Sequence, residues 1–309
     1  MRKFSIPYNG SKPDEYLNLV DNYQPYIDSI YFGVPVLKSF APVNEQFDYV
    51  YNFLEYSMGK YKRLLACNHF KYDEFNTTTE FIEYFQKVIY PIIEQYNIEG
   101  VILTNLELSR QIRKDFPKLE LHTSSNCFQY NLRTMKNWQR YGGINVFNPP
   151  RDAAKTPSML KEMHDAGFKL KVIVNQACIY GCGYQLNHGI ISNDYFCGHG
   201  DRTNIFKTNV ILPEWLKYID EYVDVYKIAG RLYPLFMLKK IFDAYILEKP
   251  YTYVNEIINS SENNPFRILE KGGIFIKPED IPEKTRWCEC KDCDTKCFEC
   301  RNAIEKLLF

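Results

Sequence analysis

The stretch Gly100-Val101-Ile102-Leu103-Thr104 sets the pattern of this chain, because it leads directly into an amphipathic segment at Asn105–Phe116. An uninterrupted apolar run of this length is typical of a parallel strand that is covered on both faces. In the following segment, Asn105 can cap a helix, and Pro117 ends it. Strand and helix signals alternate in the same way along most of the chain, which predicts a parallel α/β fold.

Eight apolar runs of this kind can be counted. They are Lys3–Pro7, Asp28–Gly33, Arg63–Cys67, Gly100–Thr104, Leu119–Thr123, Gly143–Phe147, Phe168–Asn175 and Val223–Ala229. The segments between and after them have helical patterns, including Pro157–Ala166 and Leu232–Leu247. Eight alternating strands and helices predict a (β/α)8 TIM-like barrel. An open doubly wound sheet is the alternative, although no Gly-x-Gly-x-x-Gly follows the first run.

The pattern changes near residue 250, so we expect a barrel over residues 1–250 and a C-terminal extension over residues 251–309. Within the extension, Ser260–Pro265 is typical of a loop, and Gly272–Ile276 indicates one short additional strand. The end of the extension is rich in cysteine and too small to form a core of its own. We therefore expect a bound metal to stabilise it.

The charges of the chain cancel, with 38 Lys and Arg against 38 Asp and Glu in 309 residues. A protein that coats long nucleic acids needs a basic surface, so this function is not expected. No apolar run approaches the roughly 20 residues of a transmembrane helix. The start Met1–Pro7 lacks the apolar centre of a signal peptide. We therefore expect a soluble, cytoplasmic protein without a membrane partner.

Ten cysteines stand out in such a chain, because clustered cysteines in a reducing compartment bind metals more often than they form disulfides. Three of them, Cys178, Cys182 and Cys197, fall in the loop after the seventh run, where glycines allow close approach of the backbone to sulfur. This loop can hold an iron–sulfur cluster or zinc. Cys67 ends the third run and Cys127 follows the fifth, so both lie toward the same rim and are candidates for a fourth ligand. Free buried cysteines are the alternative.

Five further cysteines lie within 13 residues of the tail, and their close spacing predicts metal binding, by zinc or by an iron–sulfur cluster. They are Cys288, Cys290, Cys293, Cys297 and Cys300. One of them can instead complete the site in the barrel loop, which would give two four-cysteine sites. The stretch Cys178–Gln185 also resembles the Cys-x3-Cys-x2-Cys motif of radical S-adenosylmethionine enzymes, with Gln185 at the third ligand position.

Three polar residues near the expected rim are candidates for catalysis. His122 ends the fifth run, His188 lies in the cysteine loop, and Arg231 follows the eighth run, where barrels often bind an anion. A structural role is the alternative for either histidine. Lys227 and Glu107 are weaker candidates, for which a solvated salt bridge is the simpler interpretation.

Four segments resemble, in the same order, motifs of the collagenase-like peptidase family U32. They are Ile27–Gly33, the histidine stretch Leu121–Asn126 with Asn131 after it, the loop Cys178–Cys197, and Val225–Arg231, which is similar to a Lys-Ile-Glu-Gly-Arg motif. The resemblance spans residues 4–247. Ala229 stands where that motif has Glu, and the cysteine-rich tail is not part of the family core.

The resemblance implies a barrel that holds a [4Fe–4S] cluster through its loop cysteines. The cysteine spacing of the tail separately predicts a second cluster or zinc there. The resemblance also implies an enzyme for oxygen-independent redox modification of the hydroxylation type. We expect a small molecule, a peptide or an RNA base as the substrate and an electron-donor protein as a partner. A zinc-dependent peptidase or hydrolase is an alternative, although the common peptidase motifs are missing. A non-enzymatic protein whose metal-stapled tail docks on a partner is another.

Overall fold

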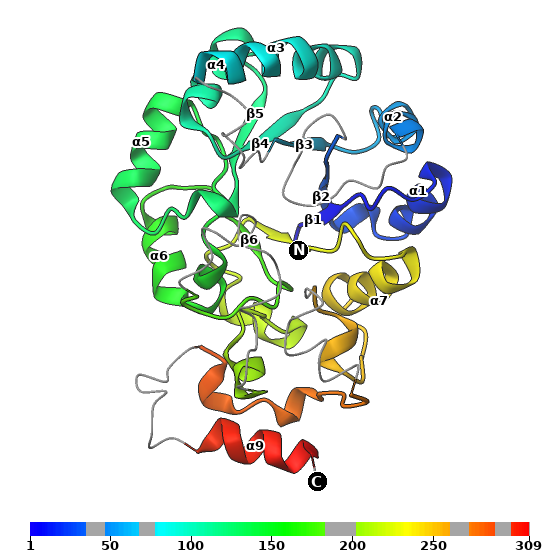
Figure 1. The fold of residues 1–309 in the computed structure, drawn as a ribbon, viewed down its shortest axis with the longest axis vertical. Coiled ribbons are helices and arrows are strands. Elements are labelled where there is room, and N and C mark those ends of the chain that lie inside the picture. Colours follow the sequence, from blue (N-terminus) through cyan, green and yellow to red (C-terminus); the bar gives the residue numbers. More distant parts are fainter. Residues whose placement is uncertain (35–46, 68–77, 183–201, 260–271, 288–297, 309) are drawn as a thin grey trace.

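The computed structural model describes residues 1–34, 47–67, 78–182, 202–259, 272–287 and 298–308. A seven-stranded parallel sheet lies at its centre, with helices around it (Figure 1). The strands are β1 (Phe4–Pro7), β2 (Ile27–Phe32), β3 (Arg63–Cys67), β4 (Gly100–Leu103), β5 (Glu120–Thr123), β6 (Lys171–Ile173) and β7 (Val225–Lys227).

Helices connect most of these strands. The α-helices are α1 (Pro13–Asp21), α2 (Phe47–Tyr56), α3 (Thr78–Gln95), α4 (Leu106–Asp115), α5 (Leu132–Gly142), α6 (Pro157–Asp165), α7 (Leu235–Ile246) and α9 (Glu299–Leu308). Short 3-10 helices are η1 (Gln24–Tyr26), η3 (Ser125–Cys127), η4 (Arg151–Lys155), η5 (Arg202–Lys207), η6 (Pro213–Tyr218), η7 (Val254–Glu256), η8 (Pro278–Asp280) and η9 (Glu283–Thr285).

The sheet closes on itself. Its strand order is β5-β4-β3-β2-β1-β7-β6, and the two outer strands are joined through residues 146 and 147. Isolated parallel bridges pair His122 with Val146 and Phe147 with Leu170. The carbonyls of Val146 and Phe147 accept hydrogen bonds of 3.1 and 2.8 Å from the neighbouring strands. The chain therefore forms an α/β barrel, as expected.

Seven of the eight expected runs contain a strand, and the sixth, Gly143–Phe147, forms only the two closing bridges. Gly143 ends α5 in the left-handed conformation with φ of 66°, and Pro149 and Pro150 follow without backbone N–H groups. Only a few residues between Gly143 and Pro149 remain to pair as a strand. The additional strand expected at Gly272–Ile276 was wrong, because Ile276 bonds to η7 instead of to a strand.

Local signals position the helices as expected. The side chain of Asn105 accepts a 2.9 Å hydrogen bond from the amide of Leu108 and caps α4. Pro157 starts α6, and Gly167 follows its end with φ of 83°. Between β6 and β7, the helices among the described residues are the 3-10 helices η5 and η6, so no α-helix lies in the described part of this connection.

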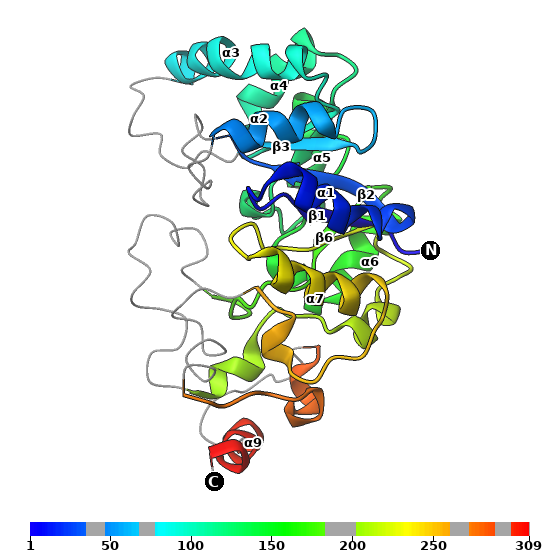
Figure 2. The same ribbon diagram turned by 90° about the vertical axis from the view of Figure 1, so that its right-hand side faces the viewer.

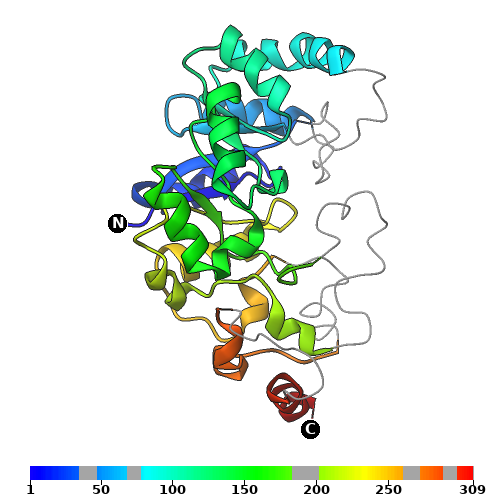
Figure 3. The same cartoon turned by 90° about the vertical axis from the view of Figure 1, so that its left-hand side faces the viewer.

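One large apolar core fills the space between the sheet and the helices. Figure 2 shows α2, α1 and α7 in succession along one side, and Figure 3 shows α5 and α6 in green on the other. Tyr8 after β1 stacks on Phe53 of α2, with ring centroids 4.0 Å apart. Val254, Ile276 and Ile304 belong to the same core. Residues beyond 250 thus pack directly on the barrel.

Candidate functional site

The interior of the barrel is separate from the outer core and is largely polar. Tyr31, Leu64 and Ile102 form a small apolar cluster of their own inside it. Because side chains alternate along a strand, residues two positions away on the same strands also face inward. On the neighbouring strand β5, His122 is in register with Ile102 and faces inward with it, as does Glu120 two positions earlier. The inward faces therefore bring charged side chains into a space enclosed by backbone.

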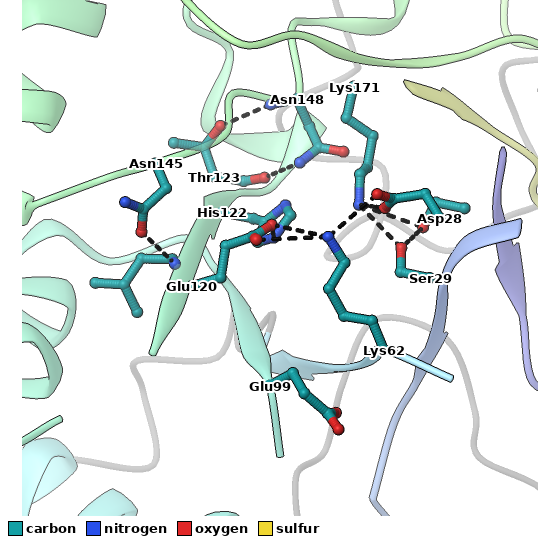
Figure 4. A network of polar contacts seen from close by, with 12 residues as sticks. Asp28, Ser29, Lys62, Glu99, Glu120, His122, Thr123, Asn145, Asn148 and Lys171 are labelled. Carbon is teal, nitrogen blue, oxygen red and sulfur yellow. Dashed lines mark hydrogen bonds and ion pairs between the residues drawn. The ribbon is translucent and has the colours of Figure 1, made fainter. Parts of the chain in front are cut away.

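A network of charges fills the end of the barrel where the strands begin (Figure 4). The Nζ atom of Lys171 lies 3.4 Å from Asp28 Oδ2 and 3.1 Å from Ser29 Oγ. Lys62 Nζ lies 3.1 Å from Asp28 Oδ1 and 3.3 Å from Glu120 Oε1. Two ammonium groups thus face two carboxylates. This network cancels its own charge within the barrel.

Burial and neighbouring charges shift the titration of this network. Burial lowers the pKa of Lys171 to about 8, although Asp28 opposes the shift. Burial disfavours ionisation of Asp28, but Lys171 and Lys62 outweigh it and hold its pKa below the ordinary value. Burial, together with the charge of Lys171, also holds the pKa of His122 well below its usual range. His122 is therefore neutral at physiological pH.

His122 lies inside the barrel above this network. Its Nε2 is 2.6 Å from Glu120 Oε1, but neither ring nitrogen has a well-aligned hydrogen bond among the described residues. The contact is therefore a close approach without the direction of a good hydrogen bond. Figure 4 shows His122 beside Glu120, near Thr123 and Asn148. A neutral imidazole of this kind can accept or donate one hydrogen bond to a ligand.

Buried polar atoms without partners accumulate toward the carboxyl ends of the strands. Within the described part of the chain, they include both polar atoms of the Gln129 amide, Asn148 Oδ1, Asn209 Oδ1 and Arg231 Nη1. Buried polar groups are rarely left unsatisfied, and such orphans indicate a missing water, ion or ligand. The candidate site is therefore placed at this end of the barrel, where α/β barrels build their active sites.

Two cations share one aromatic ring at this end. Lys227 Nζ lies 4.4 Å from the centroid of the Tyr31 ring, and Arg231 Cζ lies 5.9 Å from the same centroid. The Tyr31 hydroxyl donates a 2.8 Å hydrogen bond to the Ile228 carbonyl, which fixes the ring. Burial and the charges of Lys171, Arg231 and Arg151 lower the pKa of Lys227 to about 7. Lys227, predicted as a solvated residue, is in fact buried.

The loop that carries Arg231 is held from the neighbouring strand. Asn175 donates to the Ala229 carbonyl at 2.9 Å and accepts from the Ala229 amide at 2.7 Å. Gly230 adopts φ of 145°, which lies in a region that favours glycine. Asn9 donates a 2.8 Å hydrogen bond to the Tyr233 carbonyl. These contacts hold the backbone on both sides of Arg231.

Two of the predicted metal ligands lie together at the same end. Cys178 and Cys182 are both partly buried and close enough for their charges to interact. Burial raises the pKa of the Cys178 thiol, while Arg151 favours its thiolate. The Arg151 guanidinium is positioned by Gln176 Oε1 at 3.1 Å and Asn126 Oδ1 at 2.8 Å. Both of these partners are neutral.

Several expected site residues lie outside the described residues. They are His188, Cys197, Cys288, Cys290, Cys293 and Cys297. Cys300 lies near the start of α9, which packs against η5. In sequence, η5 follows the barrel cysteine loop and α9 follows the tail cysteines. Among the described residues, no group of three or more His, Cys, Asp or Glu side chains could hold a metal.

Cys67 and Cys127, the candidates for a fourth ligand, have other surroundings. Cys67 ends β3, but its side chain belongs to the outer core. Its sulfur lies 3.7 Å from the Leu65 carbonyl, and burial raises the thiol pKa. The Cys127 thiol donates to the Leu103 carbonyl at 3.2 Å, and burial raises its pKa to about 12. Cys67 therefore does not face the interior with the cations.

Sequence reasoning missed the inner charges of the barrel. Lys171 stands within the apolar run Phe168–Asn175, and Asp28 stands at the start of another. A charged residue within a run that is otherwise apolar is a usable signal, because its neighbours are buried. Tyr31 and Arg151 carried no comparable signal, since their roles depend on which strands and loops meet in space.

The family model described as peptidase family U32 matches residues 17–180, just over half of the chain. The chain belongs to this family. An uncharacterized protease of Methanocaldococcus jannaschii is 28% identical over 158 residues, which cover 45% of this chain and 46% of that protein. The chain thus matches about half the length of this curated relative.

A solved U32 structure shares the fold. The U32 peptidase Mk0906 aligns with a TM-score of 0.54 at 10% identity, over 74% of this chain and 93% of that one. At this identity the likeness concerns the fold alone. In the described residues, no helix combines the length and apolarity needed to cross a membrane.

Proposed function

We propose that this U32 protein is an iron–sulfur enzyme that carries out an oxygen-independent redox modification of the hydroxylation type. Its substrate, a small molecule, a peptide or an RNA base, would bind at the carboxyl ends of the strands. The observation that carries the proposal is the pair Cys178 and Cys182 beside Arg151, at the same end as Lys227 and Arg231. Hydroxylation with the oxygen of water releases two protons and two electrons, so the redox-partner protein would accept electrons from the cluster rather than donate them.

The residues at Cys178 fit a thiolate-bound cluster. Arg151 provides a positive charge beside the sulfur, which favours the thiolate form that metals bind. Gly181 has φ of 65°, with open space where a side chain would stand. Its amide points to Asp152 Oδ2 at 3.3 Å, which orders the turn between the two cysteines. Cys197 is the expected third ligand.

A [4Fe–4S] cluster bound there would supply one-electron transfer. The residues of the barrel would supply binding and proton transfer. Lys227, with a pKa of about 7, can give or take a proton near neutral pH. His122, held neutral, would act through hydrogen bonds rather than through charge. Arg231 would orient the substrate.

The tail residues Cys288, Cys290, Cys293, Cys297 and Cys300 would hold a second cluster or zinc. Cys300 lies on α9, which packs against η5, and this contact supports a site near the start of α9. Removal of residues 286–309 should then remove about half of the bound metal. An unchanged metal content would show that the tail has no site of its own.

A zinc-dependent peptidase or hydrolase is the second candidate. It is favoured by the names of the relatives, which are called a protease and a peptidase. The same cysteines accept zinc, and a zinc-bound water would then be the nucleophile of such an enzyme. The two candidates differ in the metal, and the metal can be measured directly.

The test is anaerobic purification followed by iron, sulfide and zinc analysis and an absorption spectrum. Bound iron and sulfide in equal amounts would support the proposal if Cys178→Ser and Cys182→Ser lose them, fully where the tail binds zinc and by about half where it binds a second cluster. Cys67→Ser is the matched control and should retain its iron, because that thiol lies in the outer core. Colourless protein that holds zinc would overturn the redox function. Unchanged iron in the Cys178 variant would overturn the assigned site.

A further inference from the structure

The two ends of the barrel interior differ in charge balance. At the end where the strands begin, Lys62 and Lys171 are matched by Asp28 and Glu120. At the other end, Lys227 and Arg231 have no carboxylate partner within the described part of the chain. Only 7% of Lys227 is exposed, and Arg231 Nη1 is buried without a hydrogen bond. Unmatched buried cations are costly, so a compensating group is expected.

A third positive charge lies near this pair. Arg151 is buried and acts on the charge of Lys227. Its guanidinium donates to the amide oxygens of Gln176 and Asn126, which carry no charge. Neither amide cancels the charge of Arg151, and the carboxylate of the neighbouring Asp152 accepts hydrogen bonds from Asn209, Tyr130 and the Gly181 amide. The interior beside Tyr31 therefore attracts an anion.

The cations are also positioned before any ligand arrives. Tyr31 is fixed by its bond to the Ile228 carbonyl, and its ring lies against both Lys227 and Arg231. The two bonds between Asn175 and Ala229 hold the loop that leads to Arg231. A site whose donors are already in place loses little entropy on binding.

We propose that Lys227 and Arg231 form an oxyanion subsite, over the ring of Tyr31, that binds a carboxylate or phosphate group of the substrate. The proposal rests on the proposed function and deepens it, because it limits the substrate to anionic compounds. Arg231 would offer its unpaired N–H groups, and Lys227 its ammonium. The unpaired amide of Gln129 and the unpaired Oδ1 of Asn148 are available for the uncharged part of such a ligand.

The proposal can be tested with two simple anions on the full-length, anaerobically purified protein. Sulfate represents a phosphate group and malonate a carboxylate, and each would be titrated by calorimetry at constant ionic strength against chloride. We expect at least one of them to bind. Lys227→Met and Arg231→Met should each weaken that binding about 10- to 100-fold, as expected for the loss of a charged hydrogen bond. Binding of sulfate alone would assign phosphate, and binding of malonate alone would assign a carboxylate.

Lys118→Met is the matched control, because Lys118 is exposed and should leave the affinity unchanged. No binding of either anion to the wild-type protein would overturn the proposal. Equal anion affinity in the wild type, Lys227→Met and Arg231→Met would also overturn the proposal. Iron content, measured on the same samples, tests the proposed redox function independently of anion binding. If the protein contains zinc and binds sulfate through Lys227, the oxyanion subsite is supported and the proposed iron–sulfur activity is excluded.

Discussion

Asp28→Asn tests whether the charges at the base of the barrel act as one unit. In the folded protein the pKa of Lys171 is about 8 instead of 10.5. Protonated Lys171 therefore already costs about 3 kcal/mol relative to the unfolded chain. Without Asp28 its pKa should fall below 7, and Lys171 would then fold in the neutral form at pH 7. That limits the additional cost from Lys171 to about 1–2 kcal/mol.

Lys62 loses the same partner, but it also contacts Glu120 and is partly exposed. Its contribution should therefore stay below about 1 kcal/mol. Together, Asp28→Asn should lower the free energy of unfolding by about 1–3 kcal/mol at pH 7. Urea unfolding followed by circular dichroism and tryptophan fluorescence measures this change. Asp165→Asn, in an exposed pair with Lys161, is the control and should cause no measurable change.

The pH dependence gives the sharper test. The pKa of Lys171 is lower in the folded state than in the unfolded state. At pH values between these two pKa values, the unfolded state therefore binds more protons than the folded state. Stability from this group therefore rises as pH rises from about 8 to about 10.5. Above pH 9, Lys171 is neutral in both the wild type and Asp28→Asn, so the difference between them should shrink to below about 1 kcal/mol.

A double-mutant cycle with Lys171→Met completes the argument. In that background Asp28 still faces Lys62, and Asp28→Asn should cost less than about 1 kcal/mol. An equal cost with and without Lys171, or an equal cost at pH 7 and pH 9.5, would refute the coupling between Asp28 and Lys171.

Three other predictions concern the rest of the molecule. The imidazole of His122 should stay neutral from pH 5 to pH 8, because its pKa is about 3; nitrogen NMR of labelled histidine measures this, and a protonated ring at pH 6 would contradict it. Sulfate affinity should fall as pH rises through the pKa of Lys227, about 7, and a flat calorimetric profile in the wild type would remove Lys227 from the subsite. Asn105→Ala should cost about 1 kcal/mol through loss of the α4 cap, whereas exposed Asn18→Ala within α1 should not destabilise the protein in the same unfolding assay.

The sequence was a good guide to the fold because its strand signals are local. Apolar runs such as Gly100–Thr104 stay apolar on both faces only if both faces are covered, and β4 forms there. The cap at Asn105 is equally local. The sixth run misled because Gly143 takes part in the end of α5, and the pattern of apolar residues does not show where a helix ends.

The site could be predicted only in part. Arg231 and Cys178 were found through short motifs, and the structure places both toward the carboxyl ends of the strands. The balance between Asp28 and Lys171 was not found, because these residues are 143 positions apart and meet only when the barrel closes. The prediction that Lys227 forms a solvated salt bridge was wrong for the same reason. Its burial depends on the neighbours that β7 acquires in the sheet.

The closure of the barrel has a consequence for solubility. Val146 and Phe147 are all that joins β5 to β6 among the described residues. If this short connection opens, the backbone groups of β5 and β6 lose their partners and become two free sheet edges. Such edges pair readily with another chain. Local opening at Val146 would therefore expose the molecule to aggregation before the rest of the barrel unfolds.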